Sequence, residues 1–302
     1  MFDVIVVGAG PAGLNAALTL GRARRQVLLV AGGRGRGASS PRIHGLLPHE
    51  GTPSEELRRR AFSELTGYVS VQIKQRHAAQ AKSMSGRFAV TFADGTQEMG
   101  RRLLLATGVE DVLPSIPGLA DRWGRGVVHC PYQHGWERQN LPIAALETGG
   151  LGVSLALHLR RFSDDVVLCT NRDHPPTSDQ ARLLAAWRIP VINERISRLE
   201  GAHGSIQRIV FSDGAVLPRS VVFVRPPTRQ RSDLPAQLGC GFRGDGSVQV
   251  NDLGQTTQPG VFAAGDMARR TTASLSSGHL PLAAADGVTT AITIDQQLLY
   301  AD

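Results

Sequence analysis

Three glycines near the amino terminus, Gly8, Gly10 and Gly13, have the spacing that binds the pyrophosphate of a dinucleotide. The apolar run Val4 to Val7 precedes them, and an Ala-rich helical pattern follows at once. Gly8 suits a tight turn, Gly10 lets a pyrophosphate approach the backbone, and Gly13 lets helix and strand pack closely. Free N–H groups and the helix dipole favour negative charge at this point. The sequence therefore predicts that the chain begins with a dinucleotide-binding turn.

Two βαβ patterns hold the candidate phosphate-binding turns. The first covers residues 2–31, with Pro11 in the first helical turn, where its missing N–H needs no partner. The second covers residues 143–168 and contains the glycine-rich turn 149–152. We interpret the pair as an internal duplication of nucleotide-binding units.

Hairpins and buried strands account for much of the remaining chain. Asp-Gly turns predict two β-hairpins, one at 87–99 and one at 206–217. The other expected elements are the strands 103–105 and 261–266, a loop or crossover at 226–235, and a C-terminal helix at 283–299.

The overall composition is that of an ordinary globular protein. The chain has 302 residues, of which 41% are hydrophobic and 20% charged, so two domains are expected. The first expected strand leaves no room for a signal peptide, and no apolar run is long enough to cross a bilayer. Three cysteines argue against a disulfide framework. We expect a cytoplasmic protein that does not bind membranes.

The net charge of +7 comes from arginine, because Lys74 and Lys82 are the only lysines. Nucleic-acid binding requires basic residues gathered on one face. Here the arginines are scattered in pairs, apart from the run Arg58–Arg60 on an expected helix. We therefore expect no nucleic-acid partner, and a modest attraction to an acidic protein is the alternative.

Three motifs occur in an order that marks a known family: Gly8-x-Gly10-x-x-Gly13, Ala106-Thr107-Gly108, and Gly260-Val261-Phe262-Ala263-Ala264-Gly265-Asp266. With Cys130-Pro131-Tyr132 and the short length, they make the chain resemble the low-molecular-weight thioredoxin reductases, especially the branch with small-molecule dithiol oxidases. The resemblance implies an α/β fold with two Rossmann-like domains of the three-layer ββα type. An FAD-binding domain, 1–113 and 239–302, would be split by an inserted NAD(P)H-binding-like domain, 114–238. The resemblance also implies a homodimer.

FAD is the cofactor that this resemblance implies. Asp266 would bond a hydroxyl of the ribityl chain, and the helix after it, starting at Asp286-Gly287, would aim its N-terminus at the flavin pyrimidine edge. His44 follows the first βαβ unit in a loop expected near the flavin, with capping or turn bonding as the alternative. Ala31 stands where an acid often binds the adenosine ribose. The implied cofactor-binding residues are Gly8, Gly10, Pro11, Ala12, Gly13, Gly33, His44, Thr107, Gly108, Gly265, Asp266, His279 and Leu280.

The redox pair of the family is incomplete in this chain. Gln133 stands where the second cysteine of Cys-x-x-Cys should be, three residues after Cys130. An amide forms neither a thiolate nor a disulfide. Cys169 and Cys240 are expected to be small buried hydrophobic residues. The chain should therefore not reduce thioredoxin by a dithiol relay.

Cys130 and His134 are the candidate catalytic residues. A lone thiol could attack a substrate disulfide or hold a mixed disulfide, and a packing role is the alternative. The family places an acid/base group at the position of His134, and an imidazolium there would lower the thiol pKa. No zinc site is expected from these two residues and His129. Trp136 is expected to pack in the protein.

The second dinucleotide motif also departs from the family. Aligned to the family it runs from Glu147 to Gly152, with Glu147 in place of the first glycine. In the alternative register, which starts at Gly150, Leu155 replaces the last glycine. Arg172 is one arginine where relatives that select NADPH have two or more. A carboxylate near a phosphate costs about 1 to 4 kcal/mol, so efficient NADPH use is not expected.

These departures predict that electrons reach the flavin from a substrate and leave it to dioxygen, which makes hydrogen peroxide. The leading hypothesis is an FAD-dependent oxidoreductase for a small thiol, amine or carbon-bound hydrogen, on a free or carrier-tethered intermediate of specialised metabolism. One alternative is a reductase fed by ferredoxin or by weakly bound NAD(P)H. Another is a flavin-loaded interaction module whose chemistry has decayed.

Overall fold

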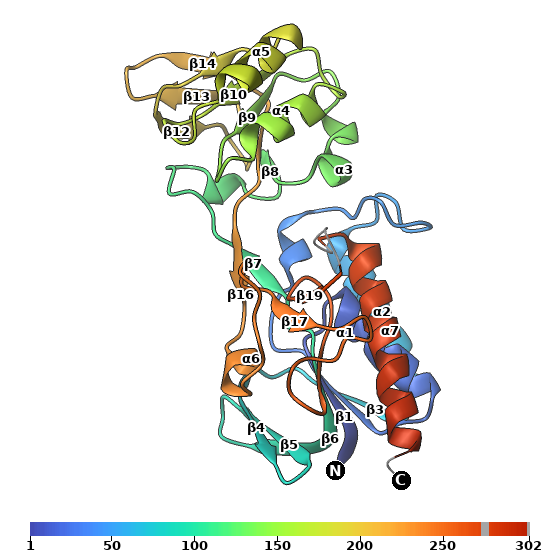
Figure 1. Cartoon of the computed structure of the whole chain (residues 1–302). Coiled ribbons are helices and arrows are strands. Elements are labelled where there is room, and N and C mark those ends of the chain that lie inside the picture. Colours follow the sequence, from blue (N-terminus) through green and yellow to red (C-terminus); the bar gives the residue numbers. More distant parts are fainter. Residues whose placement is uncertain (273–277, 301–302) are drawn as a thin grey trace. The chain divides into compact units, whose positions relative to one another are not determined.

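The computed structural model describes residues 1–272 and 278–300 and divides into two compact units (Figure 1). Unit 1 comprises residues 1–38, 55–110 and 229–302, and unit 2 comprises residues 39–54 and 111–228. The chain thus passes between units at 38/39, 54/55, 110/111 and 228/229, where the sequence suggested 113/114 and 238/239. The last two passages lie in β7 (Val109–Asp111) and β16 (Thr228–Gln230), which pair with each other. The expected loop at 226–235 therefore contains a strand.

A parallel sheet forms the centre of unit 1, in the order β3-β2-β1-β6-β18. Its strands are β1 (Phe2–Val7), β2 (Val27–Val30), β3 (Val71–Lys74), β6 (Gln97–Leu105) and β18 (Val261–Ala263).

One long strand, β6, belongs to two layers of unit 1. Its first half pairs antiparallel with β5 (Arg87–Phe92), which in turn pairs with β4 (Ala78–Met84). Its second half pairs in parallel with β1 and β18. The strand expected at 103–105 is therefore the continuation of the second hairpin strand, because Gly100 lets the backbone pass close to the Ile5 side chain.

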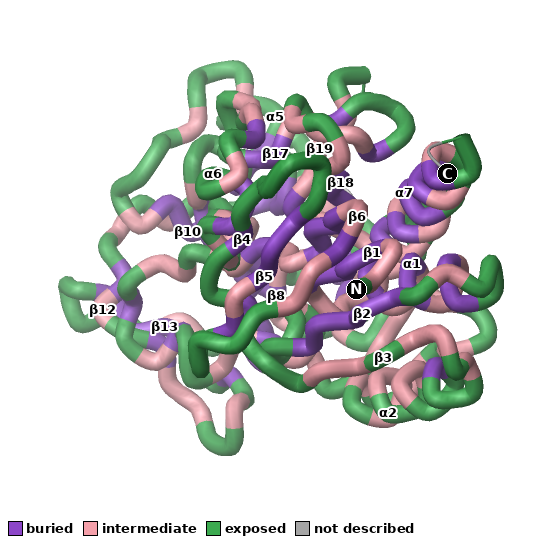
Figure 2. Tube along the Cα trace, turned by 90° about the horizontal axis from the view of Figure 1, so that it is seen from below, coloured by how far each residue is buried: buried purple, intermediate pink, exposed green. Residues whose placement is uncertain are grey.

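The alternation of side chains along β1 shows the layers. Val4 and Val6 pack in a cluster with α1 (Pro11–Arg22) and α7 (Leu280–Leu299). Ile5 and Val7 pack in a second cluster with residues of β4 and β5. In Figure 2 most of β1 and β2 is drawn in the colour of buried residues. Unit 1 thus has the predicted three layers of helices, parallel sheet and antiparallel strands.

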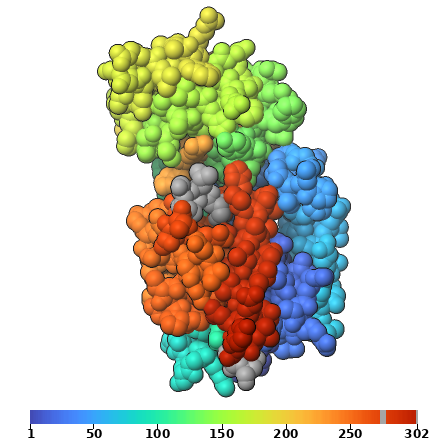
Figure 3. All heavy atoms as spheres, turned by 45° about the vertical axis from the view of Figure 1, so that its right-hand side comes forward, coloured from blue at the N-terminus to red at the C-terminus, as the bar shows by residue number. Residues whose placement is uncertain are grey.

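The C-terminal helix begins earlier than expected, at Leu280. His279 is its extended N-cap, with φ −119° and ψ 136°, and Pro281 occupies the first turn, where proline is favoured. The expected start at Asp286-Gly287 is wrong, because Gly287 lies inside the helix. A Cβ on Gly287 would overlap the carbonyl of Ala12, so this glycine lets α7 pack on α1. Figure 3 shows α7 (red) along the molecular surface.

Unit 2 repeats the architecture with a parallel sheet in the order β11-β10-β9-β15-β8 and an antiparallel sheet β12-β13-β14. The parallel strands are β8 (Val127–Val128), β9 (Ile143–Leu146), β10 (Val166–Cys169), β11 (Val191–Ile192) and β15 (Val221–Val224). The antiparallel strands are β12 (Ile196–Glu200), β13 (Arg208–Phe211) and β14 (Val216–Pro218).

The core of unit 2 also lies on both faces of its parallel sheet. Ala144 and Leu146 of β9 pack in a cluster with the antiparallel strands. Ile143 and Ala145 pack with the helices α4 (Gly152–Leu159) and α5 (Ser178–Ala186). The predicted α/β fold with two Rossmann-like units is confirmed.

The other described elements are short or lie at the edges of the units. They are α2 (Ser54–Leu65), α3 (Pro131–His134), α6 (Leu234–Gln237), β17 (Val248–Val250) and β19 (Ala268–Arg270). Among the described helices, none combines the length and apolar content that a bilayer crossing requires.

Candidate cofactor and thiol sites

The first phosphate-binding turn requires two of its glycines for steric reasons. Gly8 has φ +115°, and a Cβ there would overlap the carbonyl of Ala106. A Cβ on Gly13 would overlap the carbonyl of Gly8. Any side chain at these positions would therefore push β1, α1 and the Ala106 segment apart.

The remaining glycine of the motif, Gly10, leaves the start of α1 accessible. Gly10 is the N-cap of α1, with φ −82° and ψ −176°, and no side chain caps the helix. Nothing lies within 4 Å of a Cβ built on Gly10, and Pro11 is the first helical residue. The first amides of a helix need acceptors and attract anions. This cradle fits the pyrophosphate of a dinucleotide.

The Gly265-Asp266 pair follows β18 and lies against the same helix. Gly265 has φ +78°, and a Cβ there would approach the Cβ of Ala12 to 3.0 Å. Asp266 accepts a hydrogen bond from the Arg36 guanidinium at 3.0 Å. Arg36 escaped the sequence analysis, because it lies 230 residues from its partner in a Gly- and Arg-rich segment.

Thr107 and the start of α7 lie next to the Gly265-Asp266 segment. The Thr107 hydroxyl donates to the Met267 sulfur at 3.3 Å, and Gly108 has φ +70°. His279 and Leu280 form the start of α7, on which Asp286 bonds Arg270 at 3.0 Å. Burial raises the pKa of Asp286, Arg270 lowers it and Asp266 raises it again. The two carboxylates are thus close enough to interact.

A cavity of about 520 Å³ opens beside the end of β2. Ala31 and Gly33 line it together with Arg34, Arg58 and Arg76. Its size suits a nucleoside-sized group. The arginine run expected on a helix does lie on α2, and Arg58 brings one of its charges to this cavity.

Of the three cysteines, only Cys130 is partly exposed. It is the extended N-cap of the single-turn helix α3. Cys169 and Cys240 are buried, as predicted. Burial raises the pKa of the Cys169 thiol to about 12 and also raises the pKa of the Cys240 thiol. Of the three thiols, Cys130 is therefore the one that solvent can reach.

His134 is buried and neutral. Its side chain is 5% exposed, and its backbone N–H donates to the Cys130 carbonyl at 3.0 Å. Burial is the main cause that lowers the pKa of His134 to about 3, and the charges of Arg138, His129 and His44 contribute to this shift. The expectation that an imidazolium at this position lowers the thiol pKa is wrong, because burial disfavours the charged ring.

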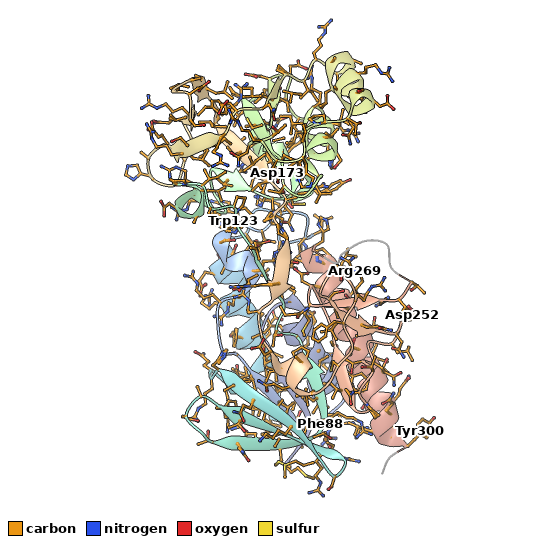
Figure 4. The ribbon with its side chains drawn as sticks, turned by 60° about the vertical axis from the view of Figure 1, so that its left-hand side comes forward. Phe88, Trp123, Asp173, Asp252, Arg269 and Tyr300 are labelled. Carbon is orange, nitrogen blue, oxygen red and sulfur yellow. The ribbon has the colours of Figure 1, made fainter. Side chains whose placement is uncertain are left out.

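Aromatic rings surround the thiol segment on two sides. The His129 ring lies 5.8 Å from the ring of Trp123, which is labelled in Figure 4, and 5.9 Å edge-on from that of His134. Tyr132 is 70% exposed, although its ring lies 4.7 Å edge-on from that of His158, and Trp136 is 71% exposed. The expectation that Trp136 packs is wrong, because it follows a one-turn helix in a short turn at the surface.

His44 lies in the part of the loop that belongs to unit 2. Its Nδ1 is 2.6 Å from a Glu50 oxygen and 3.2 Å from a Glu137 oxygen. The hydrogen bond from His44 is the main cause that lowers the Glu50 pKa. These three ligand atoms lie within 4.8 Å of one another, a spacing that could hold a metal ion. The ring is hydrogen-bonded to the Glu50 oxygen, and the Glu137 oxygen lies beside the same nitrogen.

The second dinucleotide turn is closed by a side chain. Glu147 follows β9 and is 3% exposed. One carboxylate oxygen accepts the N–H of Gly152, the first residue of α4, at 2.8 Å. The other oxygen is buried, with no hydrogen-bond partner among the described residues.

A second carboxylate holds the single arginine that follows β10. Arg172 precedes Asp173, which is labelled in Figure 4, and donates to Glu194 at 2.8 Å. Bonding to Arg172 is the main cause that lowers the pKa of Glu194 to about 2. Glu194 escaped the sequence analysis, because it lies 22 residues from Arg172. These residues do not fit a nicotinamide dinucleotide.

Comparisons with known proteins agree with the two-unit nucleotide-binding fold. The family model for pyridine nucleotide-disulphide oxidoreductases matches residues 2–287. A thioredoxin reductase of Claviceps purpurea, tcpT, is 32% identical over 92% of this chain and 91% of its own length. A putative thioredoxin reductase of Bacillus anthracis superimposes with a TM-score of 0.93 at 30% identity, over 100% and 99% of the two chains. An oxidoreductase of Agrobacterium tumefaciens superimposes with a TM-score of 0.92 at 34% identity, over 100% and 99% of the two chains.

Proposed function

The chain belongs to the pyridine nucleotide-disulphide oxidoreductase family as a thioredoxin reductase-like, FAD-dependent oxidoreductase, and we propose that it oxidises a small substrate with dioxygen. The substrate would be a thiol, an amine or a compound with a reactive carbon-bound hydrogen, either free or tethered to a carrier, in specialised metabolism. The contrast between an accessible helix start at Gly10 and a closed one at Glu147 carries this proposal.

Unit 1 would hold the cofactor. The fit of its glycine cradle to a pyrophosphate supports this assignment, as does the cavity beside β2. Bound FAD would supply two-electron chemistry between the substrate and dioxygen. The proposed holding residues within this unit are Gly8, Gly10, Pro11, Ala12, Gly13, Gly33, Thr107, Gly108, Gly265, Asp266, His279 and Leu280. His44, which unit 2 contains, stays a prediction as a flavin contact.

The electron balance of the proposed reaction requires no nicotinamide. Oxidation of two thiols to a disulfide releases two electrons and two protons, and the same numbers reduce dioxygen to hydrogen peroxide. Oxidation of an amine or a carbon-bound hydrogen releases two electrons as well. This balance requires no dithiol in the enzyme. It is therefore compatible with Gln133 in place of the second cysteine.

Cys130 would act on substrates that contain sulfur. Oxidation of the Cys130 thiol together with one substrate thiol to a mixed disulfide would release two electrons and two protons, the numbers that reduce dioxygen to hydrogen peroxide. A second substrate thiolate would then attack the substrate sulfur of this mixed disulfide, which releases the Cys130 thiolate and the disulfide product. His134 stays neutral, so its ring offers one N–H donor and one acceptor near this segment.

Two measurements on the FAD-loaded protein test the proposal. Anaerobic mixing with NADPH or NADH should leave the flavin absorbance unchanged at micromolar nicotinamide, and rapid bleaching would contradict the proposal. Oxygen uptake across a panel of thiols and amines should identify substrates. Turnover that survives Cys130→Ser indicates hydride chemistry, and turnover that is lost indicates thiol chemistry.

Failure of oxygen uptake would favour one of two other functions. Turnover only with reduced ferredoxin would indicate a reductase, and silence with every donor would indicate an interaction module. Size-exclusion chromatography with light scattering tests the proposed homodimer.

A further inference from the structure

Glu147 occupies the place that a dinucleotide needs in unit 2. In a βαβ nucleotide fold, the pyrophosphate accepts hydrogen bonds from the first amides of the helix after the glycine turn. In unit 2 that helix is α4, and the carboxylate of Glu147 already bonds the amide of Gly152. A Cβ on Gly152 would collide with this carboxylate, so the glycine at this position makes room for it.

The burial of Glu147 shows how closely its carboxylate is enclosed. A buried charge is costly unless it is compensated, and here the helix dipole and one amide provide compensation. The second oxygen has no partner among the described residues. A bound pyrophosphate would either displace the Glu147 carboxylate from this buried position or lie beside it. In the second case the two negative charges would repel each other.

Glu194 opposes binding of the 2′-phosphate of NADPH, as Glu147 opposes binding of the pyrophosphate. Arg172 is the one arginine at the end of β10, where a 2′-phosphate would be recognised, and its guanidinium bonds Glu194. Glu194 is itself held by the backbone N–H of Arg195 and the hydroxyl of Ser212. Two carboxylates of the chain thus bond groups that the two kinds of phosphate would use.

We propose that Glu147 and Glu194 are internal anions that exclude nicotinamide dinucleotides from unit 2. Glu147 excludes NADH and NADPH alike, because both carry the pyrophosphate. Glu194 acts against NADPH alone, because only NADPH carries the 2′-phosphate. This inference deepens the proposed function by naming the residues that separate the enzyme from its nicotinamide-dependent relatives.

The test measures binding of NADH and NADPH to the FAD-loaded protein by isothermal titration, without turnover. Glu147→Ala removes the carboxylate and keeps the Cβ, and Glu147→Gln keeps the size and one acceptor oxygen but removes the charge. Glu194→Gln frees Arg172. Glu200→Gln is the matched control, because Glu200 is also held by two arginines of unit 2 away from both turns.

Three of the variants have distinct expected results, and Glu147→Gln should change binding in the same direction as Glu147→Ala. Glu147→Ala should strengthen binding of both dinucleotides by about tenfold to several hundredfold. Glu194→Gln should strengthen NADPH by about two- to fivefold and leave NADH unchanged, as expected for a partly exposed ion pair. Glu200→Gln should change neither.

The inference is overturned if Glu147→Ala retains FAD and binds both dinucleotides no tighter than the original protein. If Glu147→Ala is not recovered folded, unchanged binding by Glu147→Gln overturns it in the same way. Rapid flavin reduction of the original protein by micromolar NADPH would contradict the proposed function as well. Without that reduction, a failure of the variants refutes only the roles of the two glutamates.

Discussion

The turn after β1 and the turn after β9 occupy equivalent places in two copies of one architecture, yet they treat an anion in opposite ways. At Gly8 the absence of a side chain lets the backbone close tightly, and no side chain caps α1. At Glu147 a side chain fills the turn and accepts the N–H of Gly152, the first residue of α4. The comparison teaches that a nucleotide-binding fold can keep its architecture while a single residue, Glu147, places a carboxylate where the pyrophosphate of a ligand would bind.

The largest effect at neutral pH is expected at the accessible turn. Gly13→Ala places a methyl group into the Gly8 carbonyl, so we expect loss of bound FAD and a cost of about 3 kcal/mol in stability. Gly10→Ala is the matched control, because nothing lies within 4 Å of its Cβ. It should fold with unchanged stability and bind FAD about tenfold more weakly. Flavin absorbance and thermal unfolding measure both effects, and equal behaviour of the two variants would contradict the steric distinction.

The second prediction concerns acid stability of unit 2. The folded pKa of His134 is about 3, below its ordinary value of 6.5. Stability from the neutral ring is therefore fully present above pH 6.5 and is lost as the pH falls towards 3, by about 1.4 kcal/mol per pH unit. All three tryptophans, Trp123, Trp136 and Trp187, lie in unit 2, so their fluorescence during urea unfolding reports on it.

His134→Gln serves as the reference for this pH dependence. The difference in unfolding free energy between the original protein and the variant should shrink steadily from pH 6.5 downwards. A constant difference across this range would show that His134 does not titrate as its burial requires.

The third prediction compares buried cysteines of the two units. Cys169→Ser in unit 2 should cost about 2 kcal/mol, because it buries a hydroxyl in an apolar cluster. Cys240→Ser in unit 1 should cost less, because the Cys240 sulfur already lies 3.7 Å from the Thr256 hydroxyl, which can accept a hydrogen bond. Urea unfolding measures the two costs, and the reverse order would contradict the packing described for these sites.

The smallest expected effect is at Asp266. Asp266→Asn keeps the shape but weakens the bond from Arg36, so FAD affinity should fall about tenfold, equal to about 1.4 kcal/mol. Asp295→Asn is the control, because Asp295 bonds Arg25 near the other end of α7. It should leave FAD affinity unchanged. Titration of the apoprotein with FAD measures both, and equal losses would argue against a local role of Asp266.

Local patterns predicted much of the fold. The strands around Val4 and Val27 and the turn at Gly8 were predictable, because apolar runs and glycine spacing are local properties. The long strand β6 was divided wrongly, because Gly100 and the two arginines after it interrupt its apolar pattern. The start of α7 was misplaced, because Gly287 is unfavourable in an isolated helix and is retained here for packing against Ala12.

The candidate sites were predictable as residues but less so as chemistry. Cys130 and Glu147 stood out from the family pattern in the sequence alone. The neutral state of His134 did not, because it depends on burial by residues from several segments. The partners of Asp266 and Arg172 were also hidden, since each pair joins positions far apart in the chain.

Composition, apolar periodicity and glycine spacing were thus enough to predict two nucleotide-binding units, whereas the flavin and the incomplete redox pair were predicted from the resemblance to a known family. Only the tertiary structure decided that the Glu147 carboxylate turns inward onto α4, that Glu194 holds Arg172, and that the His134 ring is uncharged. The physical reason is that motif spacing is set by neighbours in sequence. Charge, burial and hydrogen bonding are set by neighbours in space.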